Sequence, residues 1–279
     1  MSENVVSTAW LAERLSAPDI VVIDASWHLP AAKRDPRAEF LAKHIPGARF
    51  YDIDAGSEPN TALPHMLPSP EKFARDMKTL GLGDGKTVII YDAAGLFSAA
   101  RLWWMLKVFG HRHCAVLDGG LPKWEAEGRP LGSGEPAKVA ERHFTPRRNA
   151  TMVKSLADIR DAIASGSAQI ADARAPGRFR GEAPEPRPGV RSGHMPGAKN
   201  VHYLTLLNED GTLKTVEELR TVFSAAGVNL EKPVITSCGS GVNAAILSLA
   251  LAQIGAASHS LYDGSWTEWG SSTEAVELG

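Results

Sequence analysis

The chain carries one pattern of residues twice. Residues 88–125 can be laid on residues 233–270 without a gap, and the pentapeptide HIPGA at 44–48 recurs as HMPGA at 194–198. Repetition over this much of a 279-residue chain indicates two domains of similar fold, since a domain usually holds ~100–150 residues.

The stretch between the two copies has no apolar period and contains GSGEPAK and TPRRN, which is typical of a linker. We therefore expect a first domain at 1–135, a linker at 136–149 and a second domain at 150–279.

Short strands and helices alternate within each copy. In the second copy the caps and apolar runs predict, in order, a helix at 155–165, a strand at 169–173, a helix at 215–226, a strand at 233–237, a helix at 244–254 and a strand at 258–263. Such alternation predicts an α/β fold, with two tandem domains that each form a parallel sheet with helices on both faces.

Composition excludes several classes of partner. A formal charge of −2 gives no basic field for nucleic acid, and no segment has the ~18 apolar residues of a membrane span. The first residues, MSENVVSTAWLAERL, lack the features of a secretory signal. Two cysteines, Cys114 and Cys238, are too few for a disulfide framework and lack metal-ligand spacing. We expect a cytoplasmic monomer that acts on a small molecule and needs no metal or other cofactor.

One loop differs chemically between the copies. Where the first copy has DAAGLFS at 92–98, the second has SCGSGVN at 237–243. Both loops join the carboxyl end of a strand to a helix, where open α/β sheets bind ligands. Backbone N–H groups and the helix dipole at such a loop stabilise an anion, so Cys238 is expected to ionise readily and act as a nucleophile. Cys114, at the start of a strand in the first copy, is expected to be plain core.

Other interpretations of the second loop fit the sequence less well. The string Gly239-x-Gly241-x-x-Ala244 matches a dinucleotide fingerprint, but too few residues follow it for the rest of such a domain. A cysteine phosphatase needs an arginine at the end of the loop, where this chain has Ala244. Covalent transfer of a sulfur atom, held as a persulfide on Cys238, remains the favoured chemistry.

The motifs CGSGVNA, HIPGA with HMPGA, GRFRGEAPEPR and DGSWTEW resemble the two-domain rhodanese superfamily over nearly the whole chain. Within it, a loop that begins Cys-Gly-Ser-Gly-Val is similar to that of enzymes that use 3-mercaptopyruvate, whereas thiosulfate-using members carry basic residues after the cysteine. The resemblance implies a silent first domain and a catalytic second domain, with Gly239, Gly241, Val242 and Asn243 around the bound substrate.

The same resemblance implies roles for residues outside the loop. Arg178 and Arg187 correspond to two arginines that hold the carboxylate and keto oxygen of the substrate, with Arg174, Arg180 and Arg191 as rivals in the same stretch. Asp54, His65 and Ser240 correspond to a relay that protonates the departing enolate. Two departures are Phe97, where a tyrosine is common, and Asn243, where threonine is usual.

We therefore expect an enzyme that moves sulfur from 3-mercaptopyruvate, through a Cys238 persulfide, to cyanide, a small thiol or a thioredoxin-like protein, and releases pyruvate. Two alternatives remain open: a thiosulfate:cyanide sulfurtransferase, and a persulfide carrier or redox module that is not an enzyme.

Overall fold

The computed structural model describes residues 4–256 and 258–279, which form two compact units. Unit 1 contains Met1–Pro59, Pro68–Asn149 and Asn208–Leu213, and unit 2 contains Asn60–Leu67, Ala150–Leu207 and Lys214–Gly279. Each unit therefore contains one short segment from the other half of the sequence: Asn208–Leu213 in unit 1 and Asn60–Leu67 in unit 2.

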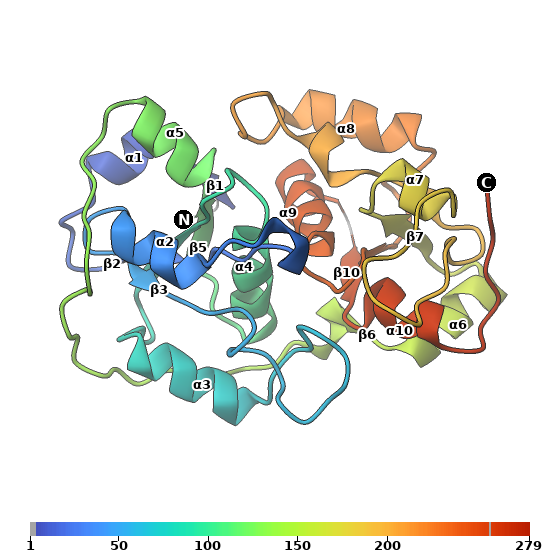
Figure 1. Ribbon diagram of the computed structural model, residues 1–279, viewed down its shortest axis with the longest axis horizontal. Helices are drawn as coiled ribbons and strands as arrows, with labels where there is room; N and C mark the ends of the chain where they lie inside the picture. Colours follow the sequence, from blue (N-terminus) through green and yellow to red (C-terminus); the bar gives the residue numbers. More distant parts are fainter. Residues whose placement is uncertain (1–3, 257) are drawn as a thin grey trace. The chain divides into compact units, whose positions relative to one another are not determined.

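Unit 1 contains a five-stranded parallel sheet with the order β1-β5-β4-β2-β3 (Figure 1). Its strands are β1 (Val5–Val6), β2 (Ile20–Asp24), β3 (Arg49–Phe50), β4 (Thr87–Tyr91) and β5 (Cys114–Leu117). Its helices are α1 (Thr8–Ala12), the 3₁₀ turn η1 (Pro30–Ala32), α2 (Pro36–Ala42), α3 (Pro70–Thr79), α4 (Ala99–Val108) and α5 (Gly120–Ala126).

Unit 2 repeats this topology with the order β6-β10-β9-β7-β8, again all parallel. Its strands are β6 (Val153–Lys154), β7 (Gln169–Asp172), β8 (Lys199–Asn200), β9 (Val234–Ser237) and β10 (His259–Tyr262). Its helices are η2 (Ala150–Met152), α6 (Leu156–Ser165), α7 (Pro176–Phe179), η3 (Tyr203–Leu206), α8 (Val216–Ala225), α9 (Ala244–Ile254) and α10 (Ser265–Ser271).

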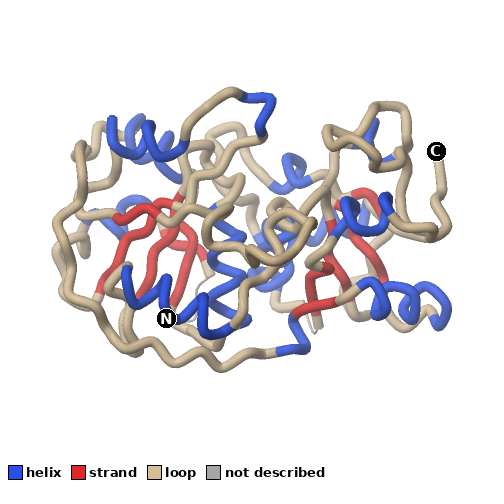
Figure 2. The backbone as a smooth tube through the Cα atoms, turned by 60° about the horizontal axis from the view of Figure 1, so that its bottom comes forward, coloured by secondary structure: helices blue, strands red, loops and turns tan. Residues whose placement is uncertain are grey.

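Helices cover both faces of each sheet, as Figure 2 shows by colour. Along β4, Ile89 and Tyr91 point to one face and join a core cluster with Leu121 of α5, while Val88 and Ile90 point to the other. Helix α4 packs against β4 and β5, and α9 packs against β9 and β10 in the same way. The predicted fold class is confirmed, and the six elements expected in the second copy are present.

The residues that predicted the helices of unit 2 form the expected local contacts. Ser155 and Thr215 both form capping boxes, in which the side chain accepts from the N3 backbone and the N3 carboxylate accepts from the cap. Helix α9 is apolar on nearly every side because it is buried, as is α4. Within the described residues, no helix is both long enough and apolar enough to cross a membrane.

The gap-free alignment of the two copies is wrong by one residue at the central strand. Val88 of β4 pairs with Cys114, whereas in unit 2 Val234 of β9 pairs with His259, so β4 is shifted by one residue against the alignment. Helices α4 and α9 start at aligned positions, because the unit 1 loop contains one residue more. The structural counterpart of Cys238 is therefore Asp92, not the alanine that follows it.

Segments exchanged between the halves of the sequence are fixed by corresponding aspartates. In unit 1, Asp118 Oδ1 accepts a hydrogen bond of 2.8 Å from the backbone N–H of Leu213. In unit 2, Asp263 Oδ2 accepts one of 2.7 Å from the backbone N–H of Leu67. Asp118 follows β5 and Asp263 follows β10, the strands beside the central β4 and β9. At the carboxyl end of each sheet, the aspartate therefore binds a segment that is distant in the sequence.

Candidate active site

The loop that joins β9 to α9 is tightly folded and almost closed to solvent. Cys238 is its first residue and is 3% exposed, while Ser240 and Val242 are 6% and 2% exposed. Gly241 has φ +81°, a left-handed conformation that side chains rarely adopt, so glycine is needed for the chain to turn into α9.

The start of α10 fixes the outer side of this loop. The backbone N–H of Cys238 donates to Ser265 Oγ at 3.2 Å, and its carbonyl accepts from the N–H of Trp266 at 2.9 Å. The carbonyl of Gly239 accepts from Thr267 twice, from the backbone N–H at 2.9 Å and from Oγ1 at 2.6 Å. The backbone on both sides of the Cys238 side chain is therefore held in place.

Ser265 is a positioning residue that the sequence did not identify. It is buried and has φ +49°, in the left-handed region that non-glycine residues seldom occupy, and its hydroxyl also donates to the Tyr262 carbonyl. The aligned residue in unit 1 is Gly120, with φ +53°. The sequence offered one signal for Ser265: the second copy has serine at the position where the first copy has Gly120.

The corresponding loop of unit 1 shows what these N–H groups can bind. Asp92 Oδ2 accepts hydrogen bonds of 2.8 Å from the backbone N–H groups of Phe97, Ser98 and Ala99, and its Oδ1 accepts from Ala94 at 2.9 Å. A carboxylate is thus surrounded by loop N–H groups at the start of α4.

His65 lies in unit 2, on the segment Asn60–Leu67, and meets the loop directly. A hydrogen bond of 2.9 Å joins His65 Nδ1 to Ser240 Oγ, and both side chains are buried. His65 has φ +60°, so its backbone is held in a sparsely populated conformation. The structure therefore brings together two of the three residues expected in the relay.

Asp54, the third residue expected in the relay, belongs to unit 1. Its carboxylate accepts hydrogen bonds of 3.1 Å at both oxygens from Trp27 Nε1. Phe97, half-buried, lies parallel to Trp27 with the ring centroids 6.1 Å apart. A link from Asp54 to His65 stays a prediction.

Arg178 lies beside the Cys238 loop. A Cβ placed on Gly239 would come within 3.1 Å of an Arg178 nitrogen, so glycine there leaves room for the guanidinium. Glu185 holds Arg178 through Nε at 3.2 Å and through a second bond from Nη2. The Arg178 side chain remains 24% exposed, so it can reach a ligand. Arg187 is half-buried in the same segment and Asn243 is the N-cap of α9, and their roles in substrate binding stay predictions.

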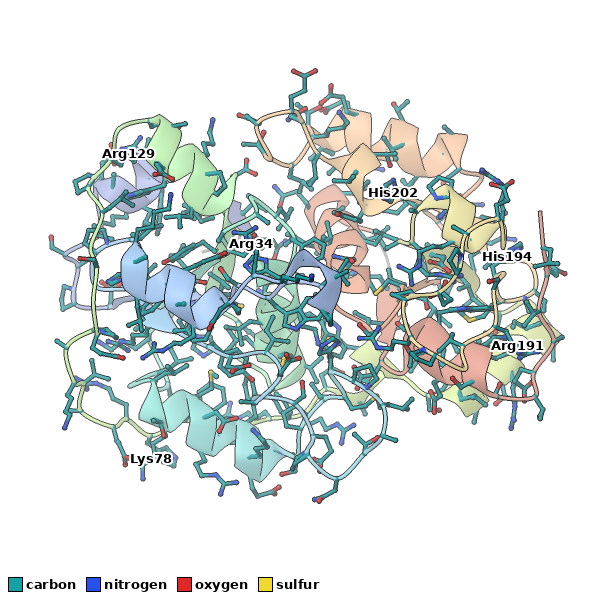
Figure 3. The ribbon with its side chains drawn as sticks, in the orientation of Figure 1. Arg34, Lys78, Arg129, Arg191, His194 and His202 are labelled. Carbon is teal, nitrogen blue, oxygen red and sulfur yellow. The ribbon has the colours of Figure 1, made fainter. Side chains whose placement is uncertain are left out.

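The rival arginines have structural partners. Arg174 is buried and pairs with Asp172 at 2.7 Å, and exposed Arg180 pairs with Glu182 at 2.6 Å. Arg191, labelled in Figure 3, donates to backbone carbonyls, among them that of Glu274 at 2.7 Å.

Cys114 lies in a strand, whereas Cys238 lies in the loop that leads into α9. Cys114 is 1% exposed inside β5, and burial raises the pKa of its thiol to about 12. Its Sγ contacts the carbonyl of His111 at 3.4 Å. Such a thiol stays protonated at neutral pH and packs as a small apolar residue.

Known proteins resemble this chain over nearly its whole length. The profile of the Rhodanese-like domain matches residues 7–127 and again 155–272. The chain belongs to the rhodanese family. This rhodanese is 46% identical to the 3-mercaptopyruvate sulfurtransferase of Escherichia coli K12, over 95% of the chain and 94% of that protein. It is 40% identical to Thiosulfate/3-mercaptopyruvate sulfurtransferase 1, mitochondrial, of Arabidopsis thaliana, over 96% of the chain and 76% of that protein.

The crystal structure of SseA, a 3-mercaptopyruvate sulfotransferase from Escherichia coli, matches this chain with a TM-score of 0.87. The sequences are 43% identical, and the match covers 95% of this chain and 99% of that one. The tandem rhodanese architecture expected from the repeat is thus confirmed.

Proposed function

We propose that this protein is a 3-mercaptopyruvate sulfurtransferase in which Cys238 carries the sulfur. The observation that supports this most is the loop itself: a buried cysteine is the first residue of the loop that leads into α9, and the loop residues after it are uncharged. A neutral loop suits the thiol of 3-mercaptopyruvate better than the dianion thiosulfate.

The first half of the reaction balances without a cofactor. The Cys238 thiolate attacks the donor sulfur, an S–S bond forms, and the carbon–sulfur bond breaks with its electron pair passing to carbon. The product is the enolate of pyruvate, which takes up one proton. In the second half, an acceptor thiolate or cyanide attacks the outer sulfur and frees the Cys238 thiolate.

Asp92 supports persulfide storage in the Cys238 loop. Each Asp92 carboxylate oxygen is two bonds from Cβ, and the outer sulfur of a cysteine persulfide is also two bonds from Cβ. Since Asp92 and Cys238 are structural counterparts, the N–H groups that surround the Asp92 carboxylate correspond to groups that would hold a persulfide anion.

Arg178 and Arg187 are proposed to bind the carboxylate and keto oxygen of the donor. The side chain of Glu185 is 4% exposed and holds one edge of the Arg178 guanidinium, which orients the remaining N–H groups. A clamp fixed in this way needs little reorganisation on binding.

Ser240 and His65 are proposed to deliver the proton to the enolate, and Asp54 to complete the relay. The 2.9 Å bond between Nδ1 and Oγ allows the imidazole to polarise the hydroxyl. Backbone N–H groups around the bound substrate are proposed to come from four loop residues: Gly239, Gly241, Val242 and Asn243.

The acceptor is proposed to be a small thiol, cyanide or a thioredoxin-like protein, and the enzyme to be a cytoplasmic monomer. Cytoplasmic reductants would keep Cys238 as a thiol, which is the state that transfer requires.

Thiosulfate is the competing donor, because the Arabidopsis relative is named for both substrates. The deciding experiment compares kcat/KM for the two donors with cyanide as acceptor. We expect 3-mercaptopyruvate to be preferred by at least about tenfold, the ratio that one well-placed charged contact gives. A preference for thiosulfate would reverse the assignment, and turnover with neither donor would favour a carrier.

A further inference from the structure

Unit 1 has a cavity of about 350 Å³ at the carboxyl end of β2, which we call the Asp24 cavity. Its volume lies at the lower end of the range for small-molecule sites. Asp24, Ser26, Ala93 and Leu121 line its inner part, and Arg34, Glu39, Lys43 and Glu125 also line it. Arg34 is labelled in Figure 3. Nothing in the sulfur-transfer mechanism uses this cavity.

The duplicated fold gives Asp24 a counterpart in unit 2. Asp24 of β2 pairs with Phe50 of β3, and Asp172 of β7 pairs with Asn200 of β8, so both end equivalent strands. Each carboxylate also accepts a hydrogen bond from the backbone N–H two residues later, at 2.8 Å in unit 1 and 2.9 Å in unit 2.

The residue two positions later is Arg174 in unit 2 and Ser26 in unit 1. Arg174 pairs with Asp172 at 2.7 Å and with Glu185 at 2.9 Å, and its guanidinium carbon lies 4.3 Å above the ring of Trp266. Unit 2 thus fills this position with a stacked, ion-paired guanidinium.

Unit 1 has smaller residues at both positions. Ser26 replaces the arginine, and Leu121, whose N–H donates to the Asp92 carbonyl as that of Trp266 does to Cys238, replaces the tryptophan. Both Ser26 and Leu121 line the cavity. The Asp24 cavity therefore corresponds to the space that a guanidinium and an indole occupy in unit 2.

Among the charged residues that line the cavity, the two basic side chains pair with glutamates and not with Asp24. Arg34 pairs with Glu39 at 2.6 Å, and Lys43 pairs with Glu125 at 2.6 Å. Across residues 4–256 and 258–279, no basic side chain forms an ion pair with Asp24. Asp24 is 1% exposed, and burial raises the pKa of its carboxyl to about 6. A cation in the cavity would restore the pair that Asp172 has in unit 2.

We propose that the Asp24 cavity binds a free organic monocation with a guanidinium group, which occupies the position that the Arg174 side chain takes in unit 2. The carboxylate of Asp24 pairs with the guanidinium, and Leu121 and Ala93 supply apolar walls for a short alkyl tail. Binding at this site does not require sulfur transfer, so a test of binding is independent of the proposed enzyme activity.

The test uses n-propylguanidine, which reproduces the end of an arginine side chain, in a titration of the full chain at pH 7.5 followed by NMR. Saturable shifts of unit 1 amides near Asp24 are expected, and n-propylurea, of the same shape but neutral, should bind at least about tenfold more weakly. Shifts that do not saturate, or equal binding of the urea, would overturn the proposal.

Two substitutions taken from unit 2 serve as matched controls. Ser26→Arg supplies the guanidinium from the chain itself, and Leu121→Trp fills the cavity from the other side. Each should weaken n-propylguanidine binding by about tenfold or more, and Asp24→Asn should do the same by removing the charge. Unchanged binding in any folded variant of the three would exclude the site.

A capped arginine, acetyl-arginine amide, separates a free ligand from a peptide side chain. The proposal expects it to bind more weakly than n-propylguanidine, because its backbone amides are not matched by the cavity. Tighter binding of the capped arginine would assign the cavity to a protein partner and overturn the free-ligand assignment.

Discussion

Asp92 occupies in unit 1 the place that Cys238 occupies in unit 2. The carbonyl of Asp92 accepts from the N–H of Leu121 at 3.0 Å, and the carbonyl of Cys238 accepts from the N–H of Trp266 at 2.9 Å. The two copies therefore have corresponding loops with different side chains: a carboxylate that accepts loop N–H groups in unit 1, and in unit 2 the thiol that is proposed to carry sulfur.

This equivalence predicts the stability of loop variants. Cys238→Asp should place a carboxylate among the N–H groups and be more stable than Cys238→Ser by about 1–2 kcal/mol. The matched change, Asp92→Asn, should destabilise the protein, since Asp92 Oδ2 accepts three N–H groups. Urea denaturation at neutral pH measures both. Equal stability of the aspartate and serine variants would mean that the Cys238 loop does not stabilise anions.

The arginine clamp is tested by conservative changes. Arg178→Lys and Arg187→Lys should each lower kcat/KM for 3-mercaptopyruvate by roughly 10–100-fold, because lysine cannot bind a planar oxygen pair through two parallel bonds. Arg180→Lys is the control, since Arg180 is exposed and pairs only with its neighbour Glu182. If thiosulfate use fell by the same factor, the two arginines would be supporting the fold or Cys238 rather than the donor.

The relay is tested by comparing donors. Ser240→Ala and His65→Asn should depress turnover with 3-mercaptopyruvate far more than turnover with thiosulfate, because only the carbon donor leaves an enolate that must be protonated. The alkylation rate of Cys238 against pH controls for a changed thiolate fraction. Wild-type turnover in both variants with an unshifted alkylation profile would remove Ser240, His65 and Asp54 from the proton path.

Much of this architecture could be predicted because the chain repeats itself. Caps at Ser155 and Thr215 and the apolar run of α9 follow local rules that tertiary packing did not override. The one-residue shift of β4 could not be predicted, since an extra loop residue leaves the apolar pattern unchanged. The exchange of Asn60–Leu67 into unit 2 depends on long-range contacts such as that of Leu67 with Asp263, which no local pattern encodes.

Ser265 and Glu185 were missed for a related reason. Each acts through a neighbour, Ser265 on the Cys238 backbone and Glu185 on the Arg178 guanidinium, so neither carries a chemical signature of its own. The proposal that Arg178 and Arg187 bind the donor depends on resemblance, because three other arginines in the same segment have equally plausible sequence contexts.

Asp24 predicts an unusual dependence of stability on pH. Its carboxyl titrates at about 6 in the folded chain against an ordinary value of 3.8, so the folded state keeps a proton that the unfolded state loses. The contribution of Asp24 to stability should therefore fall as pH rises from about 4 to about 6, by on the order of 3 kcal/mol. Asp24→Asn should remove this loss and be more stable than wild type at pH 7 but not at pH 4.

The matched control is Asp172→Asn in unit 2. That change removes one of the two carboxylate partners of buried Arg174 and should destabilise the protein at pH 7 by about 1–3 kcal/mol. Denaturation at several pH values measures both variants. A stability difference between Asp24→Asn and wild type that does not change with pH would contradict the assignment of the titration to Asp24.

Mass spectrometry after exposure to 3-mercaptopyruvate tests the central claim most directly. Without an acceptor, the peptide that contains Cys238 should gain one sulfur, about 32 Da, in step with pyruvate release, and cyanide should remove it. Cys114→Ser should behave like wild type, and Cys238→Ser should show neither the adduct nor turnover. Sulfur transfer that persists in Cys238→Ser, or an adduct found on Cys114 instead, would contradict a mechanism in which Cys238 carries the sulfur.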